Sequence, residues 1–166
     1  DYYEQALAIS REIGDRRGEG NRLGSLGNAH RYLADVRRAI DYYEQALAIA
    51  REIGDRRAEG SRLAYLGNAY ADLGEARRAI EHHLQALAIA REIGDRQGEG
   101  ILLGNLGNAY ADLGEARRAV EYHQRALIIA HEARTAATEG SPEWMAGRRA
   151  ERNSLGNLGN AHVALG

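Results

Sequence analysis

The chain of 166 residues has no cysteine, no lysine and no phenylalanine, and only one proline, one tryptophan and one methionine. Without cysteine it can form neither a disulfide framework nor a cysteine-ligated metal site, which fits a reducing compartment. No apolar run approaches the roughly 20 residues that span a bilayer. We therefore expect a cytoplasmic protein without a membrane partner.

Charge of either sign is not in excess. The chain carries 22 basic residues, all arginine, and 24 acidic residues, for a net charge of −2. A balanced surface gives no bulk attraction to nucleic acid or to an acidic lipid surface. We expect no nucleic-acid partner.

The sequence is built from a repeat. Near-copies of one segment lie at residues 1–13, 41–53, 81–93 and 121–133, a step of 40 residues each time. Apolar side chains recur there every three or four positions, which predicts an amphipathic helix. In the second copy the buried stripe would be Tyr43, Ala46, Leu47, Ala50 and Ile53.

A different helix is predicted between these segments. In the middle repeat it starts after Gly54, runs to Gly74, and is followed by the next helix near Glu75. We call it the first helix of a repeat and its successor the second helix. A turn this short makes the two lie antiparallel as a hairpin. An aspartate suited to cap the N-terminus precedes each first helix: Asp15, Asp55 and Asp95.

Glycines recur in the interior of the predicted first helices, where each costs about 1 kcal/mol relative to alanine. Because something must offset that cost, we expect the partner helix to approach closely at each of them. They are Gly27, Gly67, Gly107 and Gly159.

The repeats divide the chain into a single array. We assign residues 1–14 to the second helix of a truncated repeat, 15–54, 55–94 and 95–133 to complete repeats, 134–147 to an insertion or linker, and 148–166 to the first helix of another truncated repeat. Since the sequence starts and stops inside repeats, we expect it to be part of a longer chain.

The insertion contains the only proline, tryptophan and methionine, Pro142, Trp144 and Met145. Pro142 is expected to interrupt any helix there, because it lacks an N–H and disfavours helical geometry before it. Two hypotheses remain for the insertion. It is either a longer loop with Trp144 folded back on the array, or a dedicated contact site.

The spacing of residues in one copy resembles the tetratricopeptide repeat, with its L-G-x-x-Y…A…F…A pattern. The matching residues are Leu106, Gly107, Tyr110, Gly114, Ala119, His123, Ala126 and Leu127. Unlike the common form, each unit has 40 residues instead of 34, and Leu103 stands where tryptophan is frequent. The longer unit resembles the Pins/LGN class of adaptors and bacterial tetratricopeptide repeat proteins.

The resemblance implies an all-α fold, a tetratricopeptide-type α-solenoid in which antiparallel helix hairpins form a right-handed superhelix. The first helices of such a fold line a concave groove that holds an extended peptide. The residues that would face this groove are Asn28, Arg31, Tyr32, Tyr65, Asn68, Asp72, Asn105, Asn108, Asp112, Asn157 and Asn160.

Asparagine occupies the same groove position in all four first helices, as Asn28, Asn68, Asn108 and Asn160. An amide can pair with the N–H and C=O of a peptide backbone whatever its side chains, so these residues could clamp an extended strand. The alternative is that each asparagine bonds within the array.

Charge and size along the predicted groove indicate what it would accept. Asp72 and Asp112 make its middle acidic and favour a ligand with basic residues, whereas Arg31 is basic near the N-terminal end. Small residues are expected to leave floor space for large ligand side chains: Gly24, Ala64, Gly104 and Gly156.

No pattern for nucleophilic, metal or cofactor chemistry is found, so we expect no enzyme, no cofactor and no metal site. His83 and His123 occupy a position held by tyrosine in other copies, which indicates packing. The glutamates are expected on solvated faces. Arginine pairs recur at the start of each second helix, and we expect them to pair with Glu81 or Glu121 in preference to phosphate.

Two functions remain. The first is a protein–protein interaction scaffold that binds an extended protein or peptide segment in the groove. The alternative is a self-association module, a homo-oligomer that stacks end to end through its terminal half-repeats.

Overall fold

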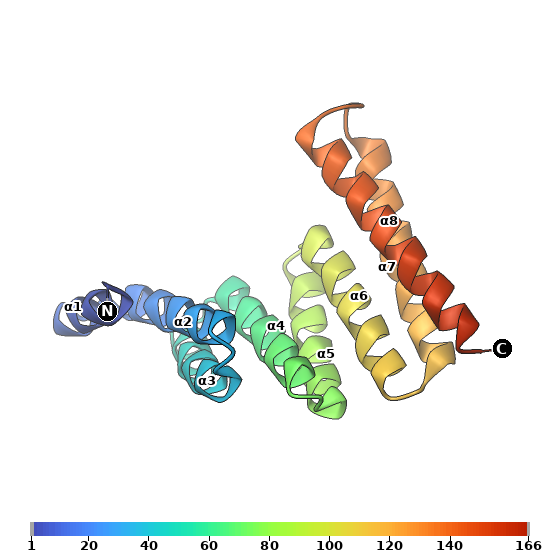
Figure 1. Cartoon of the computed structure of the whole chain (residues 1–166). Coiled ribbons are helices and arrows are strands. Elements are labelled where there is room, and N and C mark those ends of the chain that lie inside the picture. The colour runs from blue at the N-terminus through green and yellow to red at the C-terminus, as the bar shows by residue number, and fades with distance from the viewer. Residues whose placement is uncertain (1, 166) are drawn as a thin grey trace. The chain divides into compact units, whose positions relative to one another are not determined.

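The computed structural model describes residues 2–165, and every regular element in this range is an α-helix. Figure 1 labels them in chain order. They are α1 (Tyr2–Glu12), α2 (Arg16–Tyr32), α3 (Val36–Glu52), α4 (Arg56–Asp72), α5 (Ala76–Glu92), α6 (Arg96–Asp112), α7 (Ala116–Ala136) and α8 (Pro142–Val163). The predicted all-α class is confirmed. Asp1 and Gly166, at the ends of the predicted terminal segments, lie outside the described residues.

The chain divides into two compact units, residues 1–89 and 90–166, with the division inside α5. In unit 1, α1 packs on α2, α2 on α3 and α3 on α4. In unit 2, α6 packs on α7 and α7 on α8. None of the helices within residues 2–165 is both long and apolar enough to cross a membrane.

The predicted aspartate caps are confirmed. Asp15, Asp55 and Asp95 accept hydrogen bonds of 2.8 to 3.0 Å from the N–H three residues later. The glycines that follow the helices have φ between 67° and 74°, the left-handed geometry that glycine adopts without strain. Ala34 is the exception, with φ of 61° at the position where the other repeats have Gly74 and Gly114.

Close approach of the second helix explains three of the four interior glycines. A Cβ on Gly27 would lie less than 3.0 Å from the ring of Tyr43, and Gly67 and Gly107 receive the imidazoles of His83 and His123 in the same way. The expectation is wrong for Gly159, where no described atom lies within 4 Å of a Cβ. No second helix packs against this face of α8 among the described residues, so nothing there requires a glycine.

A recurrent glutamate is buried, contrary to the prediction that the glutamates are solvated. Glu59 is 8% exposed and accepts from Arg51 at 3.0 Å and from Arg56, so α3 is tied to α4. Burial alone would raise the pKa of Glu59, but the two arginines outweigh it and hold that pKa below its ordinary value. The same position is buried and bonded to arginine in the other first helices, at Glu19, Glu99 and Glu151.

The arginines at the start of the second helices pair with a residue before the helix. Arg78 lies 2.9 Å from Glu75, and Arg118 lies 2.8 Å from Glu115, so the expected partners Glu81 and Glu121 are not the ones used. Each guanidinium also lies over a tyrosine of the preceding first helix, at 5.3 Å from the ring centroid.

The predicted linker at 134–147 is mostly helix. α7 has 21 residues and α8 has 22, against 17 in α3 and α6, and only residues 137–141 connect them. Pro142 begins α8 instead of interrupting it, because the first helical position needs no N–H. Gly147 allows α7 and α8 to meet closely beside Arg134, whose Nε donates to Glu151 at 2.8 Å.

Candidate functional site

Three of the predicted groove residues of unit 1, Arg31, Tyr65 and Asp72, lie on α2 and α4 and contact other side chains. Arg31 forms an ion pair with Asp72, with Nε donating to Oδ2 at 2.6 Å and Nη2 to Oδ1 at 3.3 Å. The ring of Tyr65 stacks on Tyr43 of α3, with centroids 5.4 Å apart. The acidic and basic residues that we expected to attract ligands therefore neutralise each other here.

Asn28 is bonded within the array, yet only through its oxygen. The hydroxyl of Tyr43 donates to Asn28 Oδ1 at 2.8 Å, while the asparagine itself is exposed. Burial raises the pKa of Tyr43, so its hydroxyl stays a donor at neutral pH. This bond turns the amide oxygen inward and leaves the Nδ2 donors of Asn28 without an acceptor in the described part of the chain. Tyr32, close in sequence on α2, is 91% exposed.

Unit 2 repeats this arrangement with another donor. Nδ2 of Asn157 on α8 donates to Oδ1 of Asn108 on α6 at 3.2 Å, and Asn108 is exposed. Asp112 and Asn160 are exposed, on α6 and α8 respectively. The two remaining predicted residues are half-buried and have interaction partners: Asn68 and Asn105.

The sequence did not single out Arg62, which is central to the unit 1 surface. Its guanidinium covers Gly24, so the floor space predicted at that glycine is filled. The prediction of open space holds at Gly104 and Gly156, where no described atom lies within 4 Å of a Cβ position. The sequence did contain a signal that could have identified Arg62 as unusual. The matching position of the next repeat is a leucine, Leu102.

The two histidines of the second helices behave as packing residues. His83 and His123 are 1% and 2% exposed. Burial, followed by the nearby His82, lowers the pKa of His83 to about 4, and burial lowers that of His123, so both are neutral at pH 7. No group of three or more histidine, cysteine or acidic side chains gathers as a metal site within residues 2–165.

A family model described as tetratricopeptide repeat matches residues 1–52 and 61–130, more than half of the chain. The chain belongs to the tetratricopeptide repeat family. Tetratricopeptide repeats are in general non-catalytic scaffolds for protein–protein interaction. No curated protein matches the sequence.

Solved structures share this fold over 98% of the chain. BtubC from P. vanneervenii is 22% identical with a TM-score of 0.74, and the match covers 67% of that protein. Aspartyl phosphate phosphatase F from Bacillus subtilis is 19% identical with a TM-score of 0.77, and 42% of it is covered. A STAND protein with a tetratricopeptide repeat sensor from Pyrococcus horikoshii is 22% identical with a TM-score of 0.70, and 32% is covered. The chain thus spans less than half of the last two.

Proposed function

We propose that the chain is a non-catalytic scaffold that binds an extended protein segment along the exposed face of its first helices. The observation that carries this proposal is the orientation of the repeated asparagine. In Asn28 and Asn108 the amide oxygen accepts a bond within the array, from Tyr43 and Asn157. In each residue the bond fixes the amide group, and its Nδ2 donors are held at an exposed position.

A fixed amide donor suits a peptide carbonyl. Every residue of an extended segment has a backbone C=O, so such donors bind a strand without selecting its side chains. Because the internal bonds already fix the amides, less side-chain entropy is lost when a ligand binds. The two hypotheses for the asparagines are therefore compatible, since one amide can serve both the array and a ligand.

Charge adds a preference for one type of ligand residue to this proposal. Asp72 is neutralised by Arg31, whereas the repeat that follows has Ala71 at the position of Arg31, so its sequence offers no matching arginine for Asp112. We place a preference for basic ligand residues beside Asp112 on α6. Replacing Asp112 by asparagine should then weaken binding of basic peptides at low salt and have little effect at high salt.

The test removes the Nδ2 donors of Asn28 and Asn108 and keeps the hydrogen bonds that their side-chain oxygens accept within the array. Asn28→Asp and Asn108→Asp each retain an acceptor for the array, so the double variant should unfold at nearly the wild-type temperature. Its binding to an array of short synthetic peptides should fall about 10-fold or more, because a carboxylate repels the carbonyl that the amide would bind.

The control is a double variant with the same change of charge elsewhere. Gln45→Glu and Gln85→Glu convert exposed amides of the second helices to acids. Equal loss of peptide binding in both double variants would show an effect of net charge, and unchanged binding in the asparagine variant would reject the proposal.

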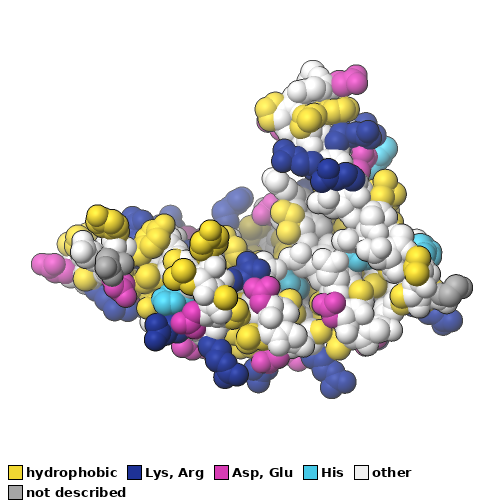
Figure 2. Space-filling view, in the orientation of Figure 1, with side chains coloured by type: hydrophobic (Ala, Val, Ile, Leu, Met, Phe, Trp, Pro, Cys, Tyr) yellow, Lys and Arg dark blue, Asp and Glu magenta, His cyan; other side chains and the backbone are white. Residues whose placement is uncertain are grey.

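A second candidate is self-association of the polypeptide 1–166, for which the terminal helices give a specific observation. Tyr3 and Ile9 of α1 are 47% and 57% exposed, although the matching Tyr43 and Ile49 of α3 are buried. Figure 2 shows apolar side chains on the surface over α1, at the left of the view. At the other end Gly159 of α8 has space where Gly27 receives Tyr43. We propose that α1 of one copy docks on α8 of the next.

Light scattering over a range of concentrations tests this candidate. The mass of the wild type should rise with concentration, and Ile9→Asp should abolish the rise, because a carboxylate would be buried in an apolar contact. Leu33→Asp, at another exposed apolar residue, should leave it unchanged. A mass that stays at one chain throughout would reject end-to-end stacking.

A further inference from the structure

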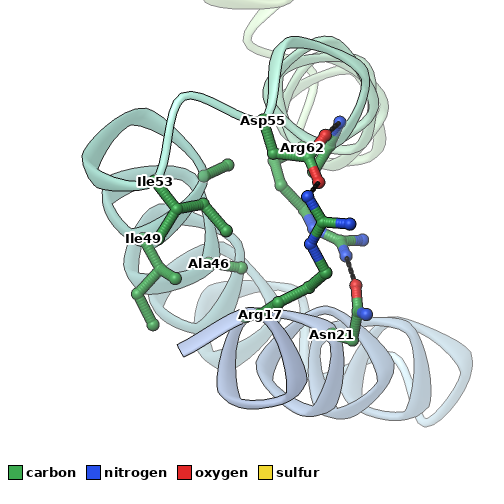
Figure 3. A pocket seen from close by; sticks show the side chains of 10 residues that line it. Arg17, Asn21, Ala46, Ile49, Ile53, Asp55 and Arg62 are labelled. Atoms are coloured by element: carbon green, nitrogen blue, oxygen red, sulfur yellow. Dashed lines mark hydrogen bonds and ion pairs between the residues drawn. The ribbon is translucent and has the colours of Figure 1, made fainter. Parts of the chain in front are cut away.

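Arg62 is held in a small cleft between α2, α3 and α4 in unit 1 (Figure 3). Its Nη2 donates to Asn21 Oδ1 at 3.2 Å. Its Cζ lies 5.9 Å from the ring centroid of Tyr65, and the guanidinium covers Gly24. The side chain is therefore fixed on three sides by groups that carry no formal charge.

The carboxylate of this cleft is used by other groups. Asp55 Oδ2 lies 3.3 Å from Nη2 of Arg17, and Asp55 Oδ1 accepts the N–H of Ala58 as a helix cap. Figure 3 shows the side chains of Arg17 and Arg62 next to each other beside Asp55. Asp55 thus pairs with Arg17 and not with Arg62, which leaves an excess of one positive charge in the cleft.

Arg62 differs in this respect from the other partly buried arginines. Arg31 and Arg134 each donate directly to a carboxylate, at 2.6 Å and 2.8 Å. Arg62 has no carboxylate within ion-pairing distance among residues 2–165, and burial lowers its pKa. A guanidinium has five N–H donors, and the bond to Asn21 uses one of them.

The apolar side of the cleft strengthens the attraction of an anion. It is lined by Ala46 and Ile49 of α3 and by Ile53, directly after that helix (Figure 3). Charges that face such a surface are screened less than charges in open water. The open space in the cleft is about that of one water molecule, so a ligand meets the guanidinium at the mouth of the cleft and no large apolar side chain fits inside.

We propose that Arg62, with Arg17 and Asn21, forms a subsite for the carboxylate of an aspartate or glutamate in a partner protein. The planar guanidinium of Arg62 can donate two parallel bonds to the two carboxylate oxygens. The carboxylate of the partner protein supplies the negative charge that Asp55 does not give to Arg62. The rest of the partner segment continues along α2 and α4. The inference rests on the proposed function for the class of ligand, and it adds an acidic residue at unit 1.

The test exchanges residues between repeats. Arg62→Leu introduces the residue that the next repeat has at this position, where Leu102 is buried. Arg57→Gln, also taken from the next repeat, removes the same charge from an exposed position of α4. An oligoglutamate peptide is the probe, and an oligoglutamine peptide is the uncharged reference. Circular dichroism checks that both variants are folded.

Arg62→Leu should weaken oligoglutamate binding about 10-fold, whereas Arg57→Gln should change it by no more than about 2-fold. In the wild type the NMR signal of Arg62 Nε–H, assigned by its loss in Arg62→Leu, should shift when oligoglutamate is added and not when oligoglutamine is added. Equal weakening in both variants, or an unmoved Arg62 signal, would overturn the proposal.

Two further comparisons separate the possible ligands and the two proposals. If inorganic phosphate shifts the Arg62 signal at lower concentration than oligoglutamate, the site is a phosphate site and the acidic-peptide assignment is wrong. If Arg62→Leu abolishes oligoglutamate binding while the double asparagine variant binds peptides normally, the subsite stands and the amide contacts fail. The reverse pattern rejects the subsite alone.

Discussion

The imidazole of His83 lies directly above Gly67, where a Cβ would be only 2.5 Å from its Cε1. His83 is 1% exposed, so its ring is packed among other side chains. We expect Gly67→Ala to force α4 and α5 apart locally and to lower the free energy of unfolding by about 1–3 kcal/mol, despite the better helix propensity of alanine. Thermal and urea denaturation followed by circular dichroism will measure the change.

Gly104 provides the matched control. It also lies inside a first helix, but no described atom is within 4 Å of its Cβ position. Gly104→Ala should therefore raise stability by up to about 1 kcal/mol, the difference in helix propensity. Loss of stability in both variants would mean that contact with His83 is not the reason for glycine at position 67.

The turn between α2 and α3 can be stabilised. Ala34 has φ of 61°, a conformation that costs an alanine roughly 1 kcal/mol and a glycine much less. Ala34→Gly should raise the free energy of unfolding by about 0.5–1 kcal/mol, and Gly74→Ala at the matching turn should lower it by a similar amount. If both substitutions changed the free energy of unfolding in the same direction, the backbone of Ala34 would not be strained.

The buried glutamate between successive repeats should be sensitive to loss of its charge. Glu59→Gln removes the carboxylate that accepts from Arg51 and Arg56, and we expect a loss of about 1–3 kcal/mol in urea denaturation at pH 7. Glu121→Gln, on an exposed position of α7, should change stability by less than about 0.5 kcal/mol. A Glu59→Gln protein as stable as wild type would show that the ion pairs contribute little.

The pH dependence of the same variant gives an independent check. The folded pKa of Glu59 is below its ordinary value of 4.5, so its stabilisation is complete above pH 4.5 and is lost as the pH falls through the lowered folded value. The wild type should therefore lose stability below about pH 4.5, and Glu59→Gln should lose less over that range. Parallel curves for the two proteins would refute this contribution.

His83 should make the fold weaken at a higher pH. Its pKa is about 4 in the folded protein against 6.5 when unfolded, so protons bind preferentially to the unfolded chain. Stability is then complete above pH 6.5 and falls by about 2 kcal/mol between pH 7 and pH 5. His83→Tyr, which restores the residue found at Tyr43, should remove this part of the pH dependence. An unchanged difference between pH 7 and pH 5 would rule it out.

Much of the fold follows from the sequence because the determinants are local. Asp55 caps a helix through an N–H three residues away, and Gly74 ends one through its own φ. The expected approach at Gly67 also follows from sequence, because a glycine inside a helix needs a compensating contact. The length of α7 and α8 does not follow from the sequence. The close contact of these helices depends on Gly147 lying beside Arg134, which only the structure shows.

The repeat spacing predicts that the asparagines share one face of the first helices, and Asn28, Asn108 and Asn160 are exposed. It could not show that Arg31 neutralises Asp72, that Tyr43 orients Asn28, or that Arg62 lacks a carboxylate. Each of these depends on which side chains of different helices come within hydrogen-bonding distance.

The sequence by itself determined the helices, their caps, the hairpin and the family, because periodicity and capping act over three or four residues. Only the tertiary structure decided which charges are satisfied. An ion pair such as Arg31 with Asp72 joins residues that are 41 positions apart. The packing of one repeat on the next sets that distance, and it leaves the amide donors of Asn28 without an acceptor and Arg62 without a carboxylate in the described part of the chain.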